Sequence, residues 1–315
     1  MKNILSIVIR ILLTAAMLFF LFKWIKIEEI AKVLHLVRLN YLIVAFALFI
    51  SLYFLCFIRW YLLLKGIDIR VPWRKLIISS FGGVFFNLFL PSTIGGDFVR
   101  IMDLTTHLKR TKEIAASVFV DRLSGFAALA FIALLAMLYG YSYIDKSGIF
   151  IPIIILFSSL SVIIIILFTK NIFSRLKNLI PGKKIRTKIE NLHSEIFYFR
   201  TKPKALLTAL LISFTVQVIG IMSNYYIFLA LGINVKLIYL FIFVPLVGAV
   251  AMIPVSIGGL GIRDMGSAFF FAKIGITKDV AVASSLLNFF FIAAISSFCG
   301  LIYVFALYNR WLQRR

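Results

Sequence analysis

Long apolar runs fill most of this sequence, and they limit its possible folds more than any other feature. A membrane-spanning helix needs about 20 successive, mostly apolar residues. Runs of about that length lie at residues 4–22, 41–64, 114–140, 149–168, 205–231 and 279–307. Apolar residues make up 62% of the chain and charged residues only 15%, a balance that soluble domains do not show. The sequence therefore predicts a single polytopic, all-α integral membrane domain over residues 1–315, with about six transmembrane helices.

Two further apolar segments are interrupted by the same motif. P-S-T-I-G-G-D-F-V-R at residues 91–100 aligns without a gap with P-V-S-I-G-G-L-G-I-R at residues 254–263. Proline lacks a backbone N–H and glycine tolerates positive φ, so both residues end helices. Within an apolar segment, such a break leaves polar backbone groups that must face protein or water rather than lipid. We therefore expect residues 76–94 and 237–256 to form broken or re-entrant hairpins.

The basic residues predict how the chain crosses the membrane. Cytoplasmic loops are enriched in Lys and Arg, and the largest basic loop covers residues 169–204. The charge bias is stronger when both hairpins are re-entrant, which places this loop and both termini in the cytoplasm. The halves at residues 76–140 and 242–307 are then inverted repeats, as in alternating-access transporters. Apolar residues at helical spacing from Ile185 to Phe199 predict an amphipathic surface helix in the basic loop.

The composition argues against two other classes of function. A net charge of +22 can indicate nucleic-acid binding, but here the basic residues lie in loops beside the spans, where topology and anionic lipid headgroups explain them better. The histidines are scattered, both cysteines lie in apolar spans, and no catalytic motif or metal-ligand spacing occurs. We therefore expect no enzymatic activity, no metal and no cofactor. Arg59, Trp60 and Tyr61, near the end of the span at 41–64, are predicted to anchor the chain at the membrane interface.

Both motif copies are typical of anion-binding sites. A helix that begins after a Gly-Gly break points free N–H groups and its positive dipole end at whatever occupies the break. Asp97 is suited to cap such a helix in the first copy. Hydroxyl groups lie beside both breaks, and an arginine one turn into each helix can grip a phosphate with two parallel bonds. The candidate substrate-binding residues are Ser92, Thr93, Gly95, Gly96, Asp97, Arg100, Asp121, Arg122, Ser256, Gly258, Gly259, Arg263 and Asp264.

Structural explanations for the same residues stay open. The motif segments could be kinked helices that pack through glycine contacts. Charged residues at membrane depth usually face the interior of the bundle, where pairs such as Asp97–Arg100 or Arg263–Asp264 would hold each other. Both explanations can hold together with substrate binding, because a site arginine needs a carboxylate partner when no substrate is bound.

Three sequence blocks resemble a known family. P-S-T-I-G-G-D-F-V-R, S-V-F-V-D-R-L-S-G at residues 117–125 and P-V-S-I-G-G-L-G-I-R-D look like the signature blocks of the lysylphosphatidylglycerol synthase transmembrane-region family, the flippase-like membrane half of the bacterial multiple peptide resistance factor. The resemblance implies a multi-pass protein of a bacterial or archaeal cytoplasmic membrane that is linked to moving lipids between leaflets. Asp97, Arg100, Asp121, Arg122 and Arg263 match the family's polar motif positions, whereas Asp264 stands where the family usually has Glu. The sequence contains no soluble aminoacyltransferase domain, so we expect a free-standing member of the family, and the resemblance leaves its substrate undetermined.

These observations predict a flippase-like transporter of a phosphate-bearing lipid. Its ligand would be an anionic phospholipid or a lipid-linked phosphate, whether plain, aminoacylated or glycosylated. Two alternatives stay open: a non-transporting membrane partner of a glycosyltransferase or lipid synthase, and a transporter of small solutes. A polar groove open to lipid would favour flipping, a closed central cavity would favour a solute, and a dry, packed motif region would favour the partner role.

Overall fold

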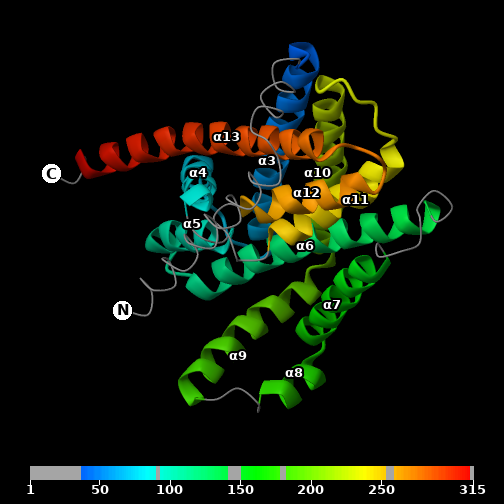
Figure 1. Cartoon of the computed structure of the whole chain (residues 1–315). Coiled ribbons are helices and arrows are strands. Elements are labelled where there is room, and N and C mark those ends of the chain that lie inside the picture. The colour runs from blue at the N-terminus through cyan, green and yellow to red at the C-terminus, as the bar shows by residue number, and fades with distance from the viewer. Residues whose placement is uncertain (1–36, 90–92, 141–149, 178–181, 253–258, 313–315) are drawn as a thin grey trace. The chain divides into compact units, whose positions relative to one another are not determined.

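The computed structural model describes residues 37–89, 93–140, 150–177, 182–252 and 259–312, and every regular element in these ranges is helical (Figure 1). The helices, labelled as in the figure, are α3 (Leu39–Gly66), α4 (Trp73–Phe89), α5 (Thr93–Leu108), α6 (Thr111–Tyr139), α7 (Phe150–Phe168), α8 (Lys170–Leu176), α9 (Lys183–Tyr198), α10 (Pro203–Ala230), α11 (Leu237–Ala251), α12 (Ile262–Ala272) and α13 (Lys278–Leu312). A 3₁₀ turn, η2 (Phe199–Thr201), follows α9. The predicted all-α fold is confirmed.

Five of the described helices are long and apolar enough to cross a membrane, namely α3, α6, α7, α10 and α13. They correspond to five of the six predicted spans, and the sixth, at residues 4–22, lies outside the described residues. Helix α11 is a shorter apolar helix that contains Pro245. The protein is therefore an integral membrane protein, while the re-entrant path of the two interrupted segments stays a prediction.

The chain divides into two compact units. Unit 1 comprises Met1–Leu52, Ile78–Arg100 and Val218–Arg315, and unit 2 comprises Tyr53–Ile77 and Ile101–Gln217. Helices α3, α4, α5 and α10 contribute residues to both units. The predicted repeat half at residues 76–140 likewise supplies both units, and its relation to residues 242–307 stays a prediction.

Unit 1 is held together by aromatic and glycine contacts onto α13. Phe46 and Phe49 of α3 pack on Phe291, with ring centroids 4.9 and 5.6 Å apart. Helix α4 approaches α13 closely, because a Cβ atom at Gly300 would overlap the ring of Phe85. Phe271 of α12 packs on Phe228 of α10 at 4.7 Å, and α12 also contacts α11 and α13. Helices α10 to α13 therefore form one packed group.

Unit 2 is organised around α6, which packs against α7 and α9. Its core consists of fully or almost fully buried residues from several segments, including Trp60, Leu76, Leu104, Ile114, Ile196 and Phe199. Burial of Trp60 corrects the sequence prediction, which placed this residue in an interfacial anchor. The indole N–H of Trp60 donates to the Ser117 hydroxyl at 3.1 Å, so the polar atom of the ring is satisfied inside the unit.

The basic loop holds the helix that its apolar spacing predicts, as α9. The end of this helix is anchored, since Ile196 is buried and Phe199 in the following turn is fully buried. Its beginning is not, because Ile185 is 58% exposed. The sequence predicted one continuous apolar face from Ile185 to Phe199. In the structure, only the second half of this face contacts the core of unit 2.

Candidate functional site

The first motif copy is helical at its glycines. Helix α5 begins at Thr93, so Gly95 and Gly96 lie in its first turn, and the prediction that Asp97 caps a helix starting after Gly96 is wrong. Gly96 is buried directly against the backbone of Gly83, where a Cβ atom would have no room. Its N–H donates to Asn87 Oδ1 at 3.0 Å. The side chain of Asn87 therefore satisfies one of the N–H groups that the sequence assigned to an anion.

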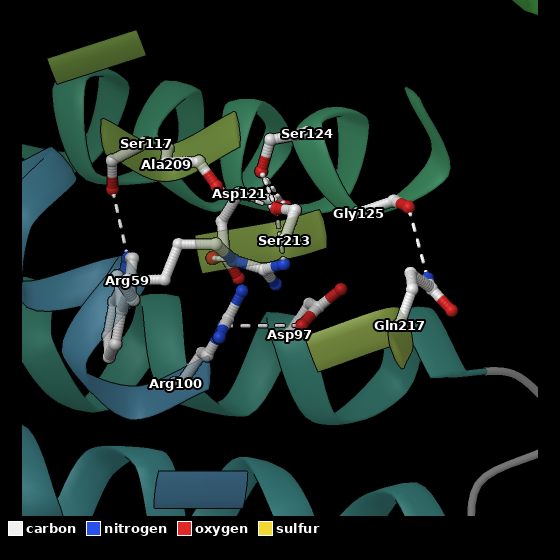
Figure 2. A network of polar contacts seen from close by, with 11 residues as sticks. Arg59, Asp97, Arg100, Ser117, Asp121, Ser124, Gly125, Ala209, Ser213 and Gln217 are labelled. Carbon is white, nitrogen blue, oxygen red and sulfur yellow. Dashed lines mark hydrogen bonds and ion pairs between the residues drawn. The ribbon is translucent and has the colours of Figure 1, made fainter. Parts of the chain in front are cut away.

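Asp97 and Arg100 form an ion pair one turn apart on α5, with 3.2 Å between Oδ1 and Nε (Figure 2). Both side chains are largely buried. The carbonyl of Arg100 also accepts a hydrogen bond from Ser79 of α4 at 2.8 Å. Asp97 and Arg100 thus hold each other, as the structural explanation predicted. Arg100 lies about two turns from the start of its helix instead of one.

The second motif copy breaks the helix, as predicted. Gly259 and Gly261 adopt φ values of 75° and 81°, which residues with a side chain rarely take. Helix α12 begins immediately afterwards at Ile262. The Asp264 carboxylate turns back onto the break and accepts the Gly261 N–H at 2.9 Å. The N-terminus of α12 is therefore capped by the protein's own carboxylate.

Arg263 lies beside this cap and is only 8% exposed. Its Nε donates to Ser285 Oγ of α13 at 2.9 Å, and its guanidinium carbon lies 5.5 Å from the centre of the Phe289 ring. Ser285 in turn donates to Asp264, so the arginine and its carboxylate share one hydroxyl. One nitrogen of the guanidinium, Nη2, has no hydrogen-bond partner among the described residues and lies 3.6 Å from Asp264 Oδ1. That distance permits Coulomb attraction but is too long for a good hydrogen bond.

A cavity of about 140 Å³ adjoins Arg263 inside unit 1. Helices α10, α11, α12 and α13 all line it. Its polar wall consists of Asn224, Arg263, Ser267, Ser284, Ser285 and Asn288, and residues of α11 form much of its apolar wall. Asn288 Nδ2 donates to Asn224 Oδ1 at 2.6 Å and so ties α13 to α10. This volume is about ten times the minimum of roughly 10–15 Å³ that one water molecule needs on a comparable measure.

Asp121 belongs to a second polar cluster, in unit 2. It pairs with Arg59 of α3, whose Nε lies 2.7 Å from Asp121 Oδ1 (Figure 2). Arg59 also donates to Ser213 of α10 at 2.8 Å, and Ser213 donates to Ser124 at 3.0 Å. Both charged side chains are almost fully buried, so the prediction that Arg59 anchors the chain at the membrane surface is wrong. Arg122, the neighbour of Asp121, is partly buried.

The sequence block at residues 117–125 explains why this cluster forms. Ser117, Asp121 and Ser124 recur at helical spacing and share one face of α6. The next residue, Gly125, leaves room for the Arg59 guanidinium and accepts a hydrogen bond from Gln217 at 3.2 Å. Sequence reasoning identified Asp121 as a candidate site residue but assigned Arg59 to the membrane interface. An arginine inside an apolar span is itself a signal for a buried partner.

Several candidate residues remain unplaced. Ser92, Ser256 and Gly258 lie outside the described residues, and the side chain of Thr93 is likewise not described. The described lining of the cavity includes Arg263 but not Arg100, so a joint grip of both arginines on one phosphate stays a prediction. In the described ranges there is no group of three His, Cys, Asp or Glu residues that could hold a metal ion.

Outside the spans, one ion pair links the loop after α3 to the turn before α10. Lys202 donates to Asp68 Oδ2 at 2.9 Å. This hydrogen bond lowers the pKa of the Asp68 carboxyl and raises the pKa of the Lys202 ammonium. Asp68 is well exposed, so the pair is of the surface type that contributes little to stability.

The fold and these clusters define a polytopic α-helical membrane protein with charged and polar residues buried among its spans. More particularly, the chain belongs to the lysylphosphatidylglycerol synthase TM region family, whose profile matches residues 7–300.

Its relatives include archaeal proteins described as UPF0104 membrane proteins. One from Pyrococcus horikoshii is 27% identical over 91% of this chain and 92% of its own length. One from Methanothermobacter thermautotrophicus is 25% identical over 93% of each chain, and one from Methanocaldococcus jannaschii is 25% identical over 88% of each. No solved structure matches the chain. The resemblance drawn from the motif blocks is thus confirmed at the level of the family.

Proposed function

We propose that this protein is a flippase-like transporter that moves a phosphate-bearing lipid between the leaflets of a cytoplasmic membrane. The observation that carries the proposal is Arg263, a buried arginine with one side-chain nitrogen lacking a hydrogen-bond partner among the described residues, beside a polar cavity. Charged residues inside membrane helices are costly, and they usually mark a substrate or ion pathway.

A phosphate oxygen would complete the hydrogen bonding of Arg263. A buried donor without a partner costs about 1–3 kcal/mol, which a bound anion would recover. Arginine suits this task because its planar fork offers two parallel N–H groups to a phosphate. Asp264 and Ser285 hold the fork from one side, so the arginine is already oriented before a ligand arrives.

The helices around the cavity support a ligand that is part of a lipid. Two of the four, α10 and α13, are long enough to span a membrane, and α11 is apolar over its whole described length. A phosphate headgroup would enter the polar wall while its acyl chains remain beside apolar helices. In this proposal, relative movement of the repeat halves then exposes the headgroup to the other leaflet.

Translocation of a fluorescent phosphatidylglycerol in proteoliposomes tests the proposal. The loss of one charge-assisted hydrogen bond costs about 1.5–3 kcal/mol, so Arg263→Ala should lower the affinity for the lipid by roughly tenfold to a hundredfold. Arg263→Lys should rescue little, because it keeps the charge but loses the fork. Arg70→Ala, at an exposed arginine, is the matched control and should transport like the unmodified protein.

Each rate is normalised to the amount of monodisperse protein recovered in detergent, which separates a binding defect from a folding defect. Transport by Arg263→Ala at the unmodified rate would contradict the site. Lipid binding without any translocation by the unmodified protein would contradict transport and favour a non-transporting partner of a lipid-modifying enzyme.

A further inference from the structure

We propose that the headgroup held at Arg263 carries hydroxyl groups beside its phosphate and carries no ammonium group, as in a glycerol phosphate or a sugar phosphate. This inference rests on the proposed function, because it names the lipid class for the same cavity. It follows from the distribution of charge and of hydrogen-bonding groups around the cavity wall.

The charged end of the cavity suits an anion and not a cation. Arg263 is the one charged residue in the described lining, and no carboxylate accompanies it there. Asp264 is fully buried, and its two oxygens already accept from Gly261 and Ser285. Residues 253–258, which connect α11 to the break, contain no acidic residue either. An ammonium group would therefore meet a like charge without a carboxylate to pair with.

The aromatic groups near the site offer no substitute for a carboxylate. An ammonium group can also bind over the face of an aromatic ring. The ring of Phe289 already lies under the Arg263 guanidinium at 5.5 Å. Phe271, which lines the cavity, packs on Phe228 at 4.7 Å and edge-on with Phe243 at 5.5 Å. These packed rings are not arranged as an open aromatic cage.

The remaining polar wall suits hydroxyl groups, which both donate and accept hydrogen bonds. Ser267 and Ser284 each donate to the carbonyl of Ala281, and their oxygens keep lone pairs that can accept. The amide of Asn288 uses one N–H on Asn224 and still has a second N–H and a carbonyl oxygen. The neutral part of the wall therefore offers both donors and acceptors near Arg263, the one charged residue in the described lining.

The decisive experiment compares lipids whose headgroups differ in their hydroxyl and ammonium groups. The full chain in detergent micelles is titrated with acyl-labelled phosphatidylglycerol, phosphatidylmethanol, phosphatidylethanolamine and lysylphosphatidylglycerol, and binding is measured by fluorescence anisotropy. Phosphatidylmethanol has the same charge as phosphatidylglycerol but lacks its hydroxyls. One neutral hydrogen bond to a headgroup hydroxyl predicts about three- to tenfold tighter binding of phosphatidylglycerol than of phosphatidylmethanol. Both lipids with an ammonium group should bind more weakly than phosphatidylglycerol by at least that factor.

Variants test whether the polar wall of the cavity causes the preference for phosphatidylglycerol. Asn288→Leu, of similar volume, should reduce the preference for phosphatidylglycerol over phosphatidylmethanol, whereas Asn171→Leu, on exposed α8, should keep the full preference. Equal binding of these two lipids by the unmodified protein, or tighter binding of either ammonium lipid, would overturn the inference. Because this assay measures binding alone, it stands apart from the proteoliposome assay. A clear preference without translocation would contradict transport and leave the headgroup class standing.

Discussion

The buried pair of Arg59 and Asp121 yields the prediction that best separates a structural role from a substrate-binding role. The carboxylate was a candidate substrate ligand by sequence, yet it lies 2.7 Å from Arg59 with both side chains almost fully buried. Removing one partner of a buried pair leaves an uncompensated charge and costs about 3–5 kcal/mol. We expect Asp121→Ala to destabilise the protein by about this amount, because the Arg59 guanidinium would keep its hydrogen bond to the Ser213 hydroxyl but lose its carboxylate partner.

Replacing both partners should cost much less than replacing one. In the double variant Arg59→Met/Asp121→Leu, no charge remains to be desolvated, and apolar pairs of similar volume often match or exceed a buried ion pair in stability. The thermal unfolding midpoint in detergent is measured for each single variant and for the double variant. Asp68→Ala removes a carboxylate from an exposed ion pair and serves as the control, with an expected loss of about 0–1 kcal/mol.

Lipid translocation by the double variant then decides the role of Asp121. If the pair only holds α3, α6 and α10 together, the folded double variant should flip lipid at the unmodified rate. If Asp121→Ala unfolded at the same thermal midpoint as the unmodified protein, the expected cost of leaving Arg59 without its carboxylate partner would be refuted. A stable double variant without transport would show that Asp121 contacts the substrate pathway after all.

Two further predictions concern regions outside the spans. His193 of α9 is stacked on Phe173 and buried, and desolvation lowers the pKa of its imidazole below the ordinary 6.5. The unfolded chain therefore binds a proton at this histidine more readily than the folded chain does. The free energy of unfolding should be highest above the ordinary pKa of histidine and should decrease as the pH falls through that value. Melting curves between about pH 8 and about pH 5 should show this loss for the unmodified protein but not for His193→Phe, and the same acid slope in both would contradict it. The predicted topology is tested by cysteine labelling. Cysteines placed at Lys146 and Lys236 should react with an impermeant maleimide from outside the cell, whereas cysteines at Lys183 and Arg314 should not. External labelling at Lys183 would show that the chain has the opposite orientation.

The spans were predictable because the bilayer imposes one length and one polarity on every crossing. Helix α6 was expected at residues 114–140 and occupies Thr111–Tyr139. The loop helix α9 was predictable from apolar spacing for the same reason, since both signals are local. Fold class and family therefore follow from the sequence alone, without any knowledge of which helices pack together.

The pairing of Arg59 with Asp121 was not predictable, because the two residues lie far apart in the chain. Arg59 and Asp121 are 62 residues apart, and Arg59 reaches Ser213 across 154 residues. An arginine inside an apolar span signals a buried partner, but nothing local in the sequence identifies which distant residue that partner is. The start of α5 was missed for a similar reason, since Gly96 lies within the helix and contacts Gly83 and Asn87, which come from the preceding helix.

The two motif copies also show how the same string can build different local structures. The position that Gly261 occupies at a φ of 81° in the second copy holds Phe98 in the first, and a side chain makes that conformation costly. The first copy therefore continues as a helix through this position, and Arg100 pairs with Asp97 on the same helix. In the second copy the chain breaks, and Asp264 turns back to cap the new helix. Arg263 lines the cavity, and its Nη2 has no hydrogen-bond partner among the described residues. Sequence symmetry alone would assign both arginines the same task, whereas the described residues place Arg100 in an ion pair with Asp97 and Arg263 in the wall of a cavity.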